Sequence, residues 1–307
     1  MATRSPTPYH PDWGIFALVA DLPNVFGSPT QKPNLQVGDL ATVGTTKYVC
    51  TLATVGAAIW TPLGGSPSIE EISGLSNARH YRFGSDPTSA AVAFTACVLV
   101  RGAIDAASAA PRYPIGTYNG AGGWGLRWTN FGGTGDTLLT FEAIITDNAG
   151  TPANFGVSNT LNAQKMILGV LVFNGNSFGN TVATLFINGA YASDVFVGGV
   201  SGAGTAGGNL TIGATNQGGT GEGLGPGWLH GAAYVTRALT FQEVVDLTEA
   251  TLSSLELANI GGGGWTNGWR VSGGDPGAAW APFVGATSLT RFGTAATYSV
   301  RDNPAVY

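Results

Sequence analysis

The chain has 307 residues, enough to bury one large hydrophobic core, and 44% of them are apolar, which excludes a disordered chain. Only 10% are charged and the formal net charge is −5, so the sequence lacks the basic surface that binds nucleic acid. No run of eighteen apolar residues predicts a membrane span, and the first residues lack the apolar segment of a secretory signal. We therefore expect neither nucleic acid nor a membrane as a partner.

The N-terminal part predicts a small β module behind an extended arm. Residues 1–13 contain three prolines and no periodicity, which is typical of an arm. Short strands are predicted at Val37–Val43, Lys47–Leu52 and Ile59–Leu63. Such a unit is too small for its own core, so we expect residues 1–70 to form an attachment module that rests on a neighbouring domain or chain.

A linker rich in Gly and Ser at residues 64–68 separates this module from a longer series of elements. Directly after it, Ile69–Leu75 predicts one helical turn. In Ala91–Arg101 every second residue from Val92 to Val100 is apolar. This period of two predicts a sandwich strand with one strongly apolar face.

Strand-like runs then recur along the chain, joined by Gly-rich turns, which is typical of an antiparallel sandwich or jelly roll. A single long helix is predicted from Phe241 to about Leu257, because Thr240 and Glu243 have the spacing of a capping box. The expected fold class is therefore mainly β with one short C-terminal helix. The predicted strands are Gly122–Trp128, Thr137–Asp147, Lys165–Phe173, Thr181–Gly189, Gly208–Gly213 and Gly227–Val235.

Residues 259–307 predict a loop-rich C-terminal extension, because tryptophans and phenylalanines are scattered there among Gly and Pro. So many aromatic side chains are too costly to leave in water. We expect the extension to pack on the sandwich or on a sister chain. The second arrangement implies a homo-oligomer, for which a trimer is one candidate.

The order of elements after residue 180 resembles that of a known family. Thr181–Gly189 ends in an Asn-Gly hairpin turn, Gly208–Gly213 is a short strand between glycines, and Gly227–Val235 leads into the capped helix. This order is similar to the C-terminal half of concanavalin A-like jelly rolls of the laminin-G-like branch, over residues 80–258. The resemblance implies a concanavalin A-like jelly-roll sandwich at residues 71–258.

Laminin-G-like sandwiches often bind calcium at a rim, through an aspartate and backbone carbonyls. Here Ala232 and Ala233 stand where the family has acidic residues. Asp136, Asp147 and Asp194 lack the paired spacing of a calcium loop, so we interpret them as residues that cap loops. We expect no metal and no cofactor.

The N-terminal module has a resemblance of its own. The Ala-Asp-Leu-Pro run that ends at Pro23, the Val37–Val43 strand and the closing Trp60 resemble short modules near the N-termini of tailed-phage virion proteins. The resemblance implies a structural subunit of a virion, such as a fibre, spike or capsid decoration protein, made in the host cytoplasm. It would bind other virion proteins through residues 1–64 and expose its jelly roll to host-cell or environmental glycans.

Two other functions stay open: a free carbohydrate-binding lectin module and a degenerate glycoside hydrolase. The β-glucanases of this fold carry three acidic residues on one strand as E-x-D-x-x-E, and this sequence has no such run. His10, His80 and His230 are scattered, and we interpret His230 as a structural residue at a strand end. We therefore expect no enzymatic activity. Cys50 and Cys97 lack CxxC spacing and are expected to be unpaired buried thiols.

One aromatic segment holds the candidate binding residues. Trp124, Arg127, Trp128 and Asn130 would suit a sugar platform, because flat rings stack on the apolar faces of sugars while Arg and Asn bond to hydroxyls. The alternative is that the rings fill the open end of the sandwich. The shared strand parity of the two tryptophans favours this second interpretation.

Overall fold

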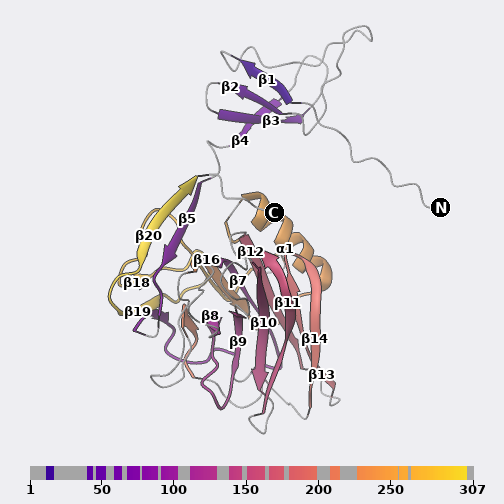
Figure 1. Ribbon diagram of the computed structural model, residues 1–307, viewed down its shortest axis with the longest axis vertical. Helices are drawn as coiled ribbons and strands as arrows, with labels where there is room; N and C mark the ends of the chain where they lie inside the picture. The colour runs from indigo at the N-terminus through magenta and orange to yellow at the C-terminus, as the bar shows by residue number, and fades with distance from the viewer. Residues whose placement is uncertain are drawn as a thin grey trace, which may run out of the picture. The chain divides into compact units, whose positions relative to one another are not determined.

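The computed structural model divides the chain into two compact units, Met1–Ser68 and Ile69–Tyr307, and each is described by itself (Figure 1). The structure describes residues 12–16, 40–43, 46–52, 59–63, 68–76, 78–88, 91–102, 111–129, 138–146, 151–162, 166–175, 180–198, 208–214, 227–254, 256–261 and 264–302.

The first unit contains one four-stranded sheet in the order β1-β2-β3-β4. β1 pairs with β2 in parallel, whereas β3 is antiparallel to both β2 and β4. The strands are β1 Asp12–Phe16, β2 Leu40–Val43, β3 Thr46–Leu52 and β4 Ile59–Leu63. The last three fall on the predicted runs, while β1 begins inside the predicted arm. Most of that arm, residues 1–11, lies outside the described residues.

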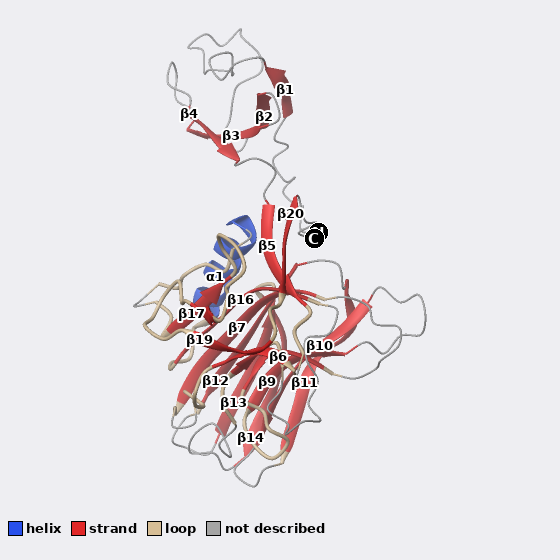
Figure 2. Cartoon of the chain, turned by 90° about the vertical axis from the view of Figure 1, so that its left-hand side faces the viewer, coloured by secondary structure: helices blue, strands red, loops and turns tan. Residues whose placement is uncertain are grey.

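The second unit is a sandwich of two eight-stranded sheets (Figures 1 and 2). The first, called the β10 sheet, has the order β11-β10-β9-β8-β15-β6-β19-β18. Its strands are β6 Arg79–Arg82, β8 Arg112–Gly116, β9 Trp124–Thr129, β10 Leu138–Thr146, β11 Pro152–Asn162, β15 Thr211–Ile212, β18 Ala279–Trp280 and β19 Leu289–Gly293.

The other sheet, called the β7 sheet, has the order β14-β13-β12-β7-β16-β5-β20, and β17 also pairs with β16. Its central pairs, β12 with β7 and β7 with β16, are antiparallel. The expected mainly β, antiparallel fold class is confirmed. The strands are β5 Ser68–Ser73, β7 Ala93–Arg101, β12 Met166–Asn174, β13 Asn180–Ile187, β14 Ala190–Gly198, β16 Trp228–Val235, β17 Asn267–Arg270 and β20 Thr297–Asp302.

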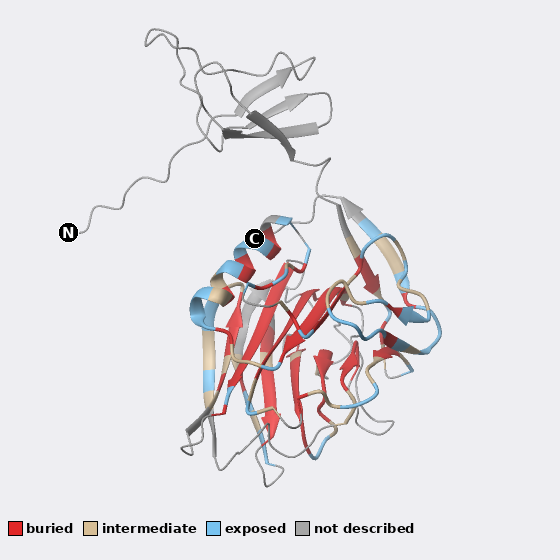
Figure 3. Cartoon of the chain, turned by 180° about the vertical axis from the view of Figure 1, so that it is seen from behind, coloured by how far each residue is buried: buried red, intermediate tan, exposed pale blue. Residues whose placement is uncertain are grey.

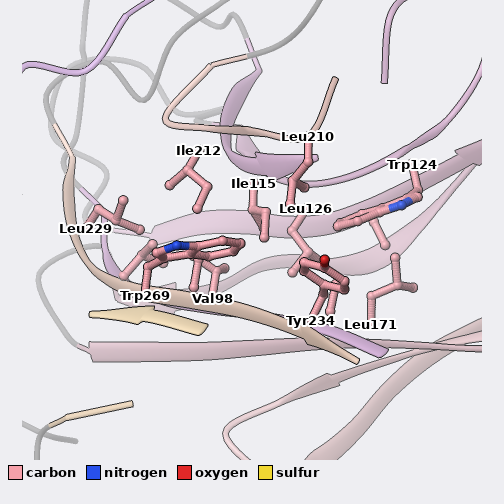
Figure 4. Close-up of a cluster of buried hydrophobic side chains, with 14 of the residues drawn as sticks. Val98, Ile115, Trp124, Leu126, Leu171, Leu210, Ile212, Leu229, Tyr234 and Trp269 are labelled. Atoms are coloured by element: carbon pink, nitrogen blue, oxygen red, sulfur yellow. The ribbon is translucent and has the colours of Figure 1, made fainter. Parts of the chain in front are cut away.

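The main core lies between the two sheets and follows the period of two along each strand. Figure 4 shows side chains of β7, β9, β15 and β16 meeting there. Trp124 packs against the ring of Phe94, which in turn stacks on Phe173 with 5.2 Å between centroids. Inward side chains of β7 and β9 are Phe94, Ala96, Val98, Val100, Trp124, Leu126 and Trp128.

Helix α1, Phe241–Ser254, covers the outer face of the β7 sheet (Figure 2). Cys97 and Leu99 of β7 point toward it and are fully buried with Val244 and Leu247. The sequence predicted one apolar face for β7; the structure shows that both faces are buried, because the helix covers the second. Cys97 is a free buried thiol, whereas the side chain of Cys50 lies outside the described residues.

The start of α1 has the predicted capping box. The backbone N–H of Thr240 donates to Glu243 Oε2 at 2.8 Å, and the backbone N–H of Glu243 faces Thr240 Oγ1 at 3.3 Å. Leu239 and Val244 on either side are buried together, as in a hydrophobic staple. The helix ends at Ser254, earlier than predicted, where the serine hydroxyl donates back to the carbonyl of Ala250 at 2.8 Å.

Two parts of the sequence interpretation need correction. Ile69–Leu75 holds strand β5 instead of a helical turn. Residues 259–307 supply β17 and β20 to one sheet and β18 and β19 to the other, so they complete the sandwich instead of packing on it as a loop-rich extension. The first and last strands of the unit, β5 and β20, are neighbours (Figure 1).

Candidate functional site

The prediction of a sugar platform is wrong for its two tryptophans, because both rings are buried. Trp124 is 0% and Trp128 2% exposed, and both point into the main core. The indole N–H of Trp124 is satisfied inside the protein, where it donates to Thr88 Oγ1 at 2.7 Å. A ring with no exposed face cannot stack on a sugar. The two rings are buried because Trp124 and Trp128 have the same parity in β9 and so lie on its inward face. This is the alternative interpretation, in which the rings fill the sandwich.

Arg127 lies on the opposite, outward face of β9 and is already engaged. Its Nε donates to Glu142 Oε2 at 2.9 Å, and its Nη1 donates to the Tyr113 hydroxyl at 3.1 Å. Burial alone would lower the pKa of Arg127, but Tyr113 and Glu142 outweigh this and raise it, so the guanidinium stays charged. Gly125 leaves room for this arrangement, because a Cβ there would lie 3.2 Å from the Tyr113 ring. Asn130 lies outside the described residues.

His230 belongs to a closed ionic cluster that the sequence did not predict. Its Nδ1 donates to the Glu70 carbonyl at 3.1 Å, and its Nε2 lies 3.7 Å from Glu71 Oε2. Arg101 donates to both carboxylate oxygens of Glu71, at 2.8 and 3.0 Å. All three side chains are nine-tenths or more buried, so no substrate reaches them. The cluster ties β5, β7 and β16 together, which fits the structural interpretation of His230.

Burial sets the protonation of this histidine. Burial, followed by the charge of Arg101, lowers the pKa of His230 to about 3, against the effect of its hydrogen bond to Glu70. The imidazole is therefore neutral at pH 7, which agrees with an Nδ1–H that donates to a carbonyl.

Exposed aromatic rings are few in the described part of the chain, and two of them lie together. Figure 3 shows buried residues along the strands of the sandwich and exposed residues along one side of α1. Tyr191 is 57% and Phe241 59% exposed, whereas Phe186, which contacts both, is buried. The ring centroid of Phe186 lies 6.3 Å from that of Tyr191 and 6.0 Å from that of Phe241. We call Phe186, Tyr191 and Phe241 the hairpin–helix cluster.

A tight turn positions the first of these rings. Asn188 and Gly189 both have positive φ, 48° and 78°, as a two-residue hairpin turn requires, and the sequence predicted this Asn-Gly turn. The side chain of Asn188 accepts a hydrogen bond from the Leu168 backbone N–H at 2.8 Å and so fixes the turn to β12. The turn sets the register that places Phe186 directly opposite Tyr191.

The capped start of α1 positions the second ring. Phe241 is the first residue after the cap Thr240, so its side chain lies at the rim of the helix while the next turn is held down by Val244. Gly189 of the hairpin lies close to Thr248 of the same helix, since a Cβ on the glycine would approach the threonine to 3.2 Å. The hairpin and the helix are therefore packed together, and the two exposed rings have a rigid base.

The cluster offers apolar ring faces with a polar edge. Partial desolvation and a hydrogen bond to the Asp194 carboxylate raise the pKa of Tyr191, so its hydroxyl stays protonated. On the helix, the side-chain amide of Gln242 donates to Asp246 Oδ1 at 2.7 Å. Aromatic faces beside hydroxyl, amide and carboxylate groups match the alternating apolar and polar surface of a sugar. No pattern in the sequence predicts these exposed rings, because alternation along a strand does not show which aromatic side chain stays uncovered.

The described residues hold neither a metal-binding cluster nor a helix that could span a membrane. Within them no group of three or more His, Cys, Asp or Glu side chains is placed to hold a metal ion. Asp194 is exposed beside the cluster, and Asp136 and Asp147 fall in stretches that the structure does not describe. In the same described ranges, no helix has the length and apolar character of a transmembrane span.

Only the comparison with solved structures finds proteins similar to this chain, and the similarity concerns the fold. No family model matches the chain, and no curated protein matches its sequence. Among solved structures, it is similar to a putative carbohydrate binding protein from Bacteroides ovatus, with a TM-score of 0.52 and 13% identity over 88% of this chain and 71% of that one.

Two further solved structures are similar over shorter stretches. They are a heptameric SAP-like pentraxin from Limulus polyphemus (TM-score 0.44, 16% identity, 60% of this chain and 82% of that one) and the binding domain of botulinum neurotoxin serotype D (0.40, 11%, 63% and 49%). The two-sheet topology and the likeness to the Bacteroides ovatus structure give the fold, a jelly-roll β-sandwich.

Proposed function

We propose that this protein is a lectin that binds a neutral glycan through the hairpin–helix cluster, without turning it over. The exposure of Tyr191 and Phe241 on one rigid base is the observation that carries the proposal. Rings of this size are costly to leave in water, and stacking on the C–H face of a sugar would cover them. The likeness of the fold to a putative carbohydrate binding protein supports the same class of ligand.

The polar groups of the cluster support binding over catalysis. Glycoside hydrolysis needs two carboxyl groups on either side of the scissile bond. Asp194, beside the cluster, is hydrogen-bonded to Tyr191, and on the helix Asp246 accepts from Gln242. Both carboxylates therefore accept hydrogen bonds that orient Tyr191 and Gln242, as in a binding site with fixed polar groups.

A glycan array tests the proposal. We expect the wild-type protein to bind a subset of immobilised neutral oligosaccharides, and Tyr191→Ala and Phe241→Ala each to weaken that binding by up to about tenfold, since a stacked ring contributes about 0.5–1.5 kcal/mol. Val92→Ala is the matched control, because Val92 is an exposed apolar residue directly before β7, outside the cluster. Full binding by both aromatic variants would refute the assignment of the site.

We propose, as a second and compatible role, that the protein is a structural subunit of a virion, attached through residues 1–64. The specific observation in its favour is that residues 1–68 form a compact unit of their own, with a short four-stranded sheet. A sheet this small gains stability from a partner. Deleting residues 1–64 should leave a folded sandwich, seen by circular dichroism, that no longer joins particles or homo-oligomers. Unchanged incorporation would remove this role.

A further inference from the structure

Strands β6 and β19 concentrate positive charge in an acidic chain. They pair antiparallel, with Arg82 opposite Thr290 and His80 opposite Phe292. The two strands contain three arginines and one histidine but no acidic residue, whereas the whole chain has 13 Lys and Arg against 18 Asp and Glu. An anion near these strands therefore meets a local field opposite in sign to the net charge.

The outward face of this strand pair holds a fixed guanidinium beside an exposed ring. Tyr81 and Leu289 point into the main core, so the residues that alternate with them, His80, Arg82 and Phe292, point outward. The Phe292 ring is 49% exposed and stacks on His80, with 5.0 Å between centroids and 27° between planes. The guanidinium carbon of Arg82 lies 5.1 Å from the centroid of the same ring.

Hydrogen bonds fix the orientations of the His80 ring and the Arg82 guanidinium. His80 Nδ1 lies 3.3 Å from the Ser76 carbonyl, so we assign the ring proton to that nitrogen. Nε2 is then an acceptor, and Arg82 Nη2 donates to it at 3.3 Å. The guanidinium is therefore oriented by the His80 ring rather than by a carboxylate of the described residues.

The ion pairs elsewhere on the sandwich contrast with the surroundings of Arg82. Each of four arginines on the described sandwich has a carboxylate within 3 Å, whereas none of the described carboxylates lies within ion-pair distance of Arg82. In addition, Arg82 Nε is shielded from solvent and makes no hydrogen bond. The four pairs are Arg101 with Glu71, Arg127 with Glu142, Arg237 with Glu243 and Arg270 with Glu256.

We propose that Arg82, Thr290 and Phe292 form a binding site for a sugar that carries a carboxylate, a hexuronic acid. The planar guanidinium matches a carboxylate and binds it through two parallel N–H donors. The exposed face of Phe292 stacks on the C–H groups of the sugar ring. The hydroxyl of Thr290, exposed and directly opposite Arg82, bonds to a ring hydroxyl. The site lies on the β10 sheet, apart from the hairpin–helix cluster, and does not depend on the lectin proposal.

Short oligogalacturonides test this site, with their methyl esters as neutral controls of the same shape. By calorimetry at low salt we expect the acid to bind at least about tenfold more tightly than the ester, because only the acid offers a charged acceptor. Arg82→Gln should remove about tenfold or more of the affinity for the acid. Arg82→Lys should keep only part of the affinity for the acid, because lysine lacks the two parallel N–H donors of the guanidinium. Arg270→Gln, which removes an arginine paired with Glu256, should leave binding unchanged.

Equal affinity of the wild-type protein for acid and ester would overturn the proposal, as would unaltered binding by Arg82→Gln. Absence of binding to either form would also overturn it. If Arg82→Gln fails to fold, Phe292→Ala takes its place, with an expected loss of about threefold or more. Tyr191→Ala should bind the acid normally, so this result separates the site from the hairpin–helix cluster.

Discussion

His230 links the stability of the sandwich to pH. Its pKa is lowered to about 3 in the folded protein, against about 6.5 for an unfolded histidine. Between these two values the unfolded chain binds a proton that the folded chain does not, so stability falls as the pH falls. The loss is fully present only near pH 3 and absent above about pH 7.

We expect unfolding by urea to show this dependence. From pH 7 to pH 5, the wild-type protein should lose stability at a rate approaching 1.4 kcal/mol per pH unit from this group alone, once the pH is below about 6. His230→Gln should be less stable at pH 7 but should show a smaller difference between the two pH values. An equal difference in both proteins would contradict the assignment of a neutral buried imidazole.

Trp128 tests the core placement that replaces the sugar platform. Its ring fills space beside Gly227, where a Cβ would approach the ring to 2.5 Å. Trp128→Ala should cost about 3–5 kcal/mol in chemical denaturation, the usual loss for truncating a buried large aromatic residue. Val92→Ala, which changes an exposed side chain, should cost less than about 0.5 kcal/mol. A loss under about 1 kcal/mol for Trp128→Ala would mean that the ring is not in the core.

For single residues, the sequence predicts which side chains of a strand share a face, but it does not predict which of them stay exposed to solvent. The alternation through Trp124 and Trp128 correctly indicated a shared face, because a strand has a fixed period of two. The uncovered rings of Tyr191 and Phe241 depend on where α1 stops covering the β7 sheet. That boundary is a tertiary feature with no local signal.

The helix cap is the element that the sequence described best, because a capping box is a local pattern. The Arg237 guanidinium and the backbone of Thr240 bind the Glu243 carboxylate, and its pKa is lowered to about 2. The Glu243 carboxylate of the capping box is therefore ionised at neutral pH. Thr240 contributes the side-chain oxygen that faces the N–H of the first turn.

We expect Thr240→Ala to cost roughly 1 kcal/mol, because it leaves an N–H of the first turn without its acceptor. Thermal or chemical unfolding measures this loss, and Thr240→Ser, which keeps the hydroxyl, is the control. Both Thr240 variants should still bind the glycan, with at most a small loss of affinity if the position of the adjacent Phe241 changes. A melting temperature unchanged within error would show that the cap does not hold the helix.

Strands whose state depends on distant partners were the ones that the sequence missed. β5 contains two glutamates, which favour helix locally, yet it pairs with β16 and buries Ile72 and Glu71. The short strands β17 to β20 lie among glycines and prolines. They are fixed by pairing: β17 with β16, β18 with β19, β19 with β6, and β20 with β5. Tertiary contacts outweigh local preference in such strands.

For the whole molecule, the fold leaves two separate places where a ligand can meet it. One sheet is covered by α1 and ends in the hairpin–helix cluster, while the other carries Arg82 and Phe292 on its outer face. Fold class could be predicted because strand periodicity and Gly-rich turns are repeated along the chain. The sites could not, since each joins residues more than forty positions apart in the sequence.

The most direct test of the central claim is a calorimetric titration of the wild-type protein and the Tyr191→Ala/Phe241→Ala double variant with the neutral oligosaccharide that binds best on the array. The double variant should keep its fold, because both side chains are more than half exposed, and should lose at least about tenfold in affinity. Unchanged affinity in a folded double variant would contradict it.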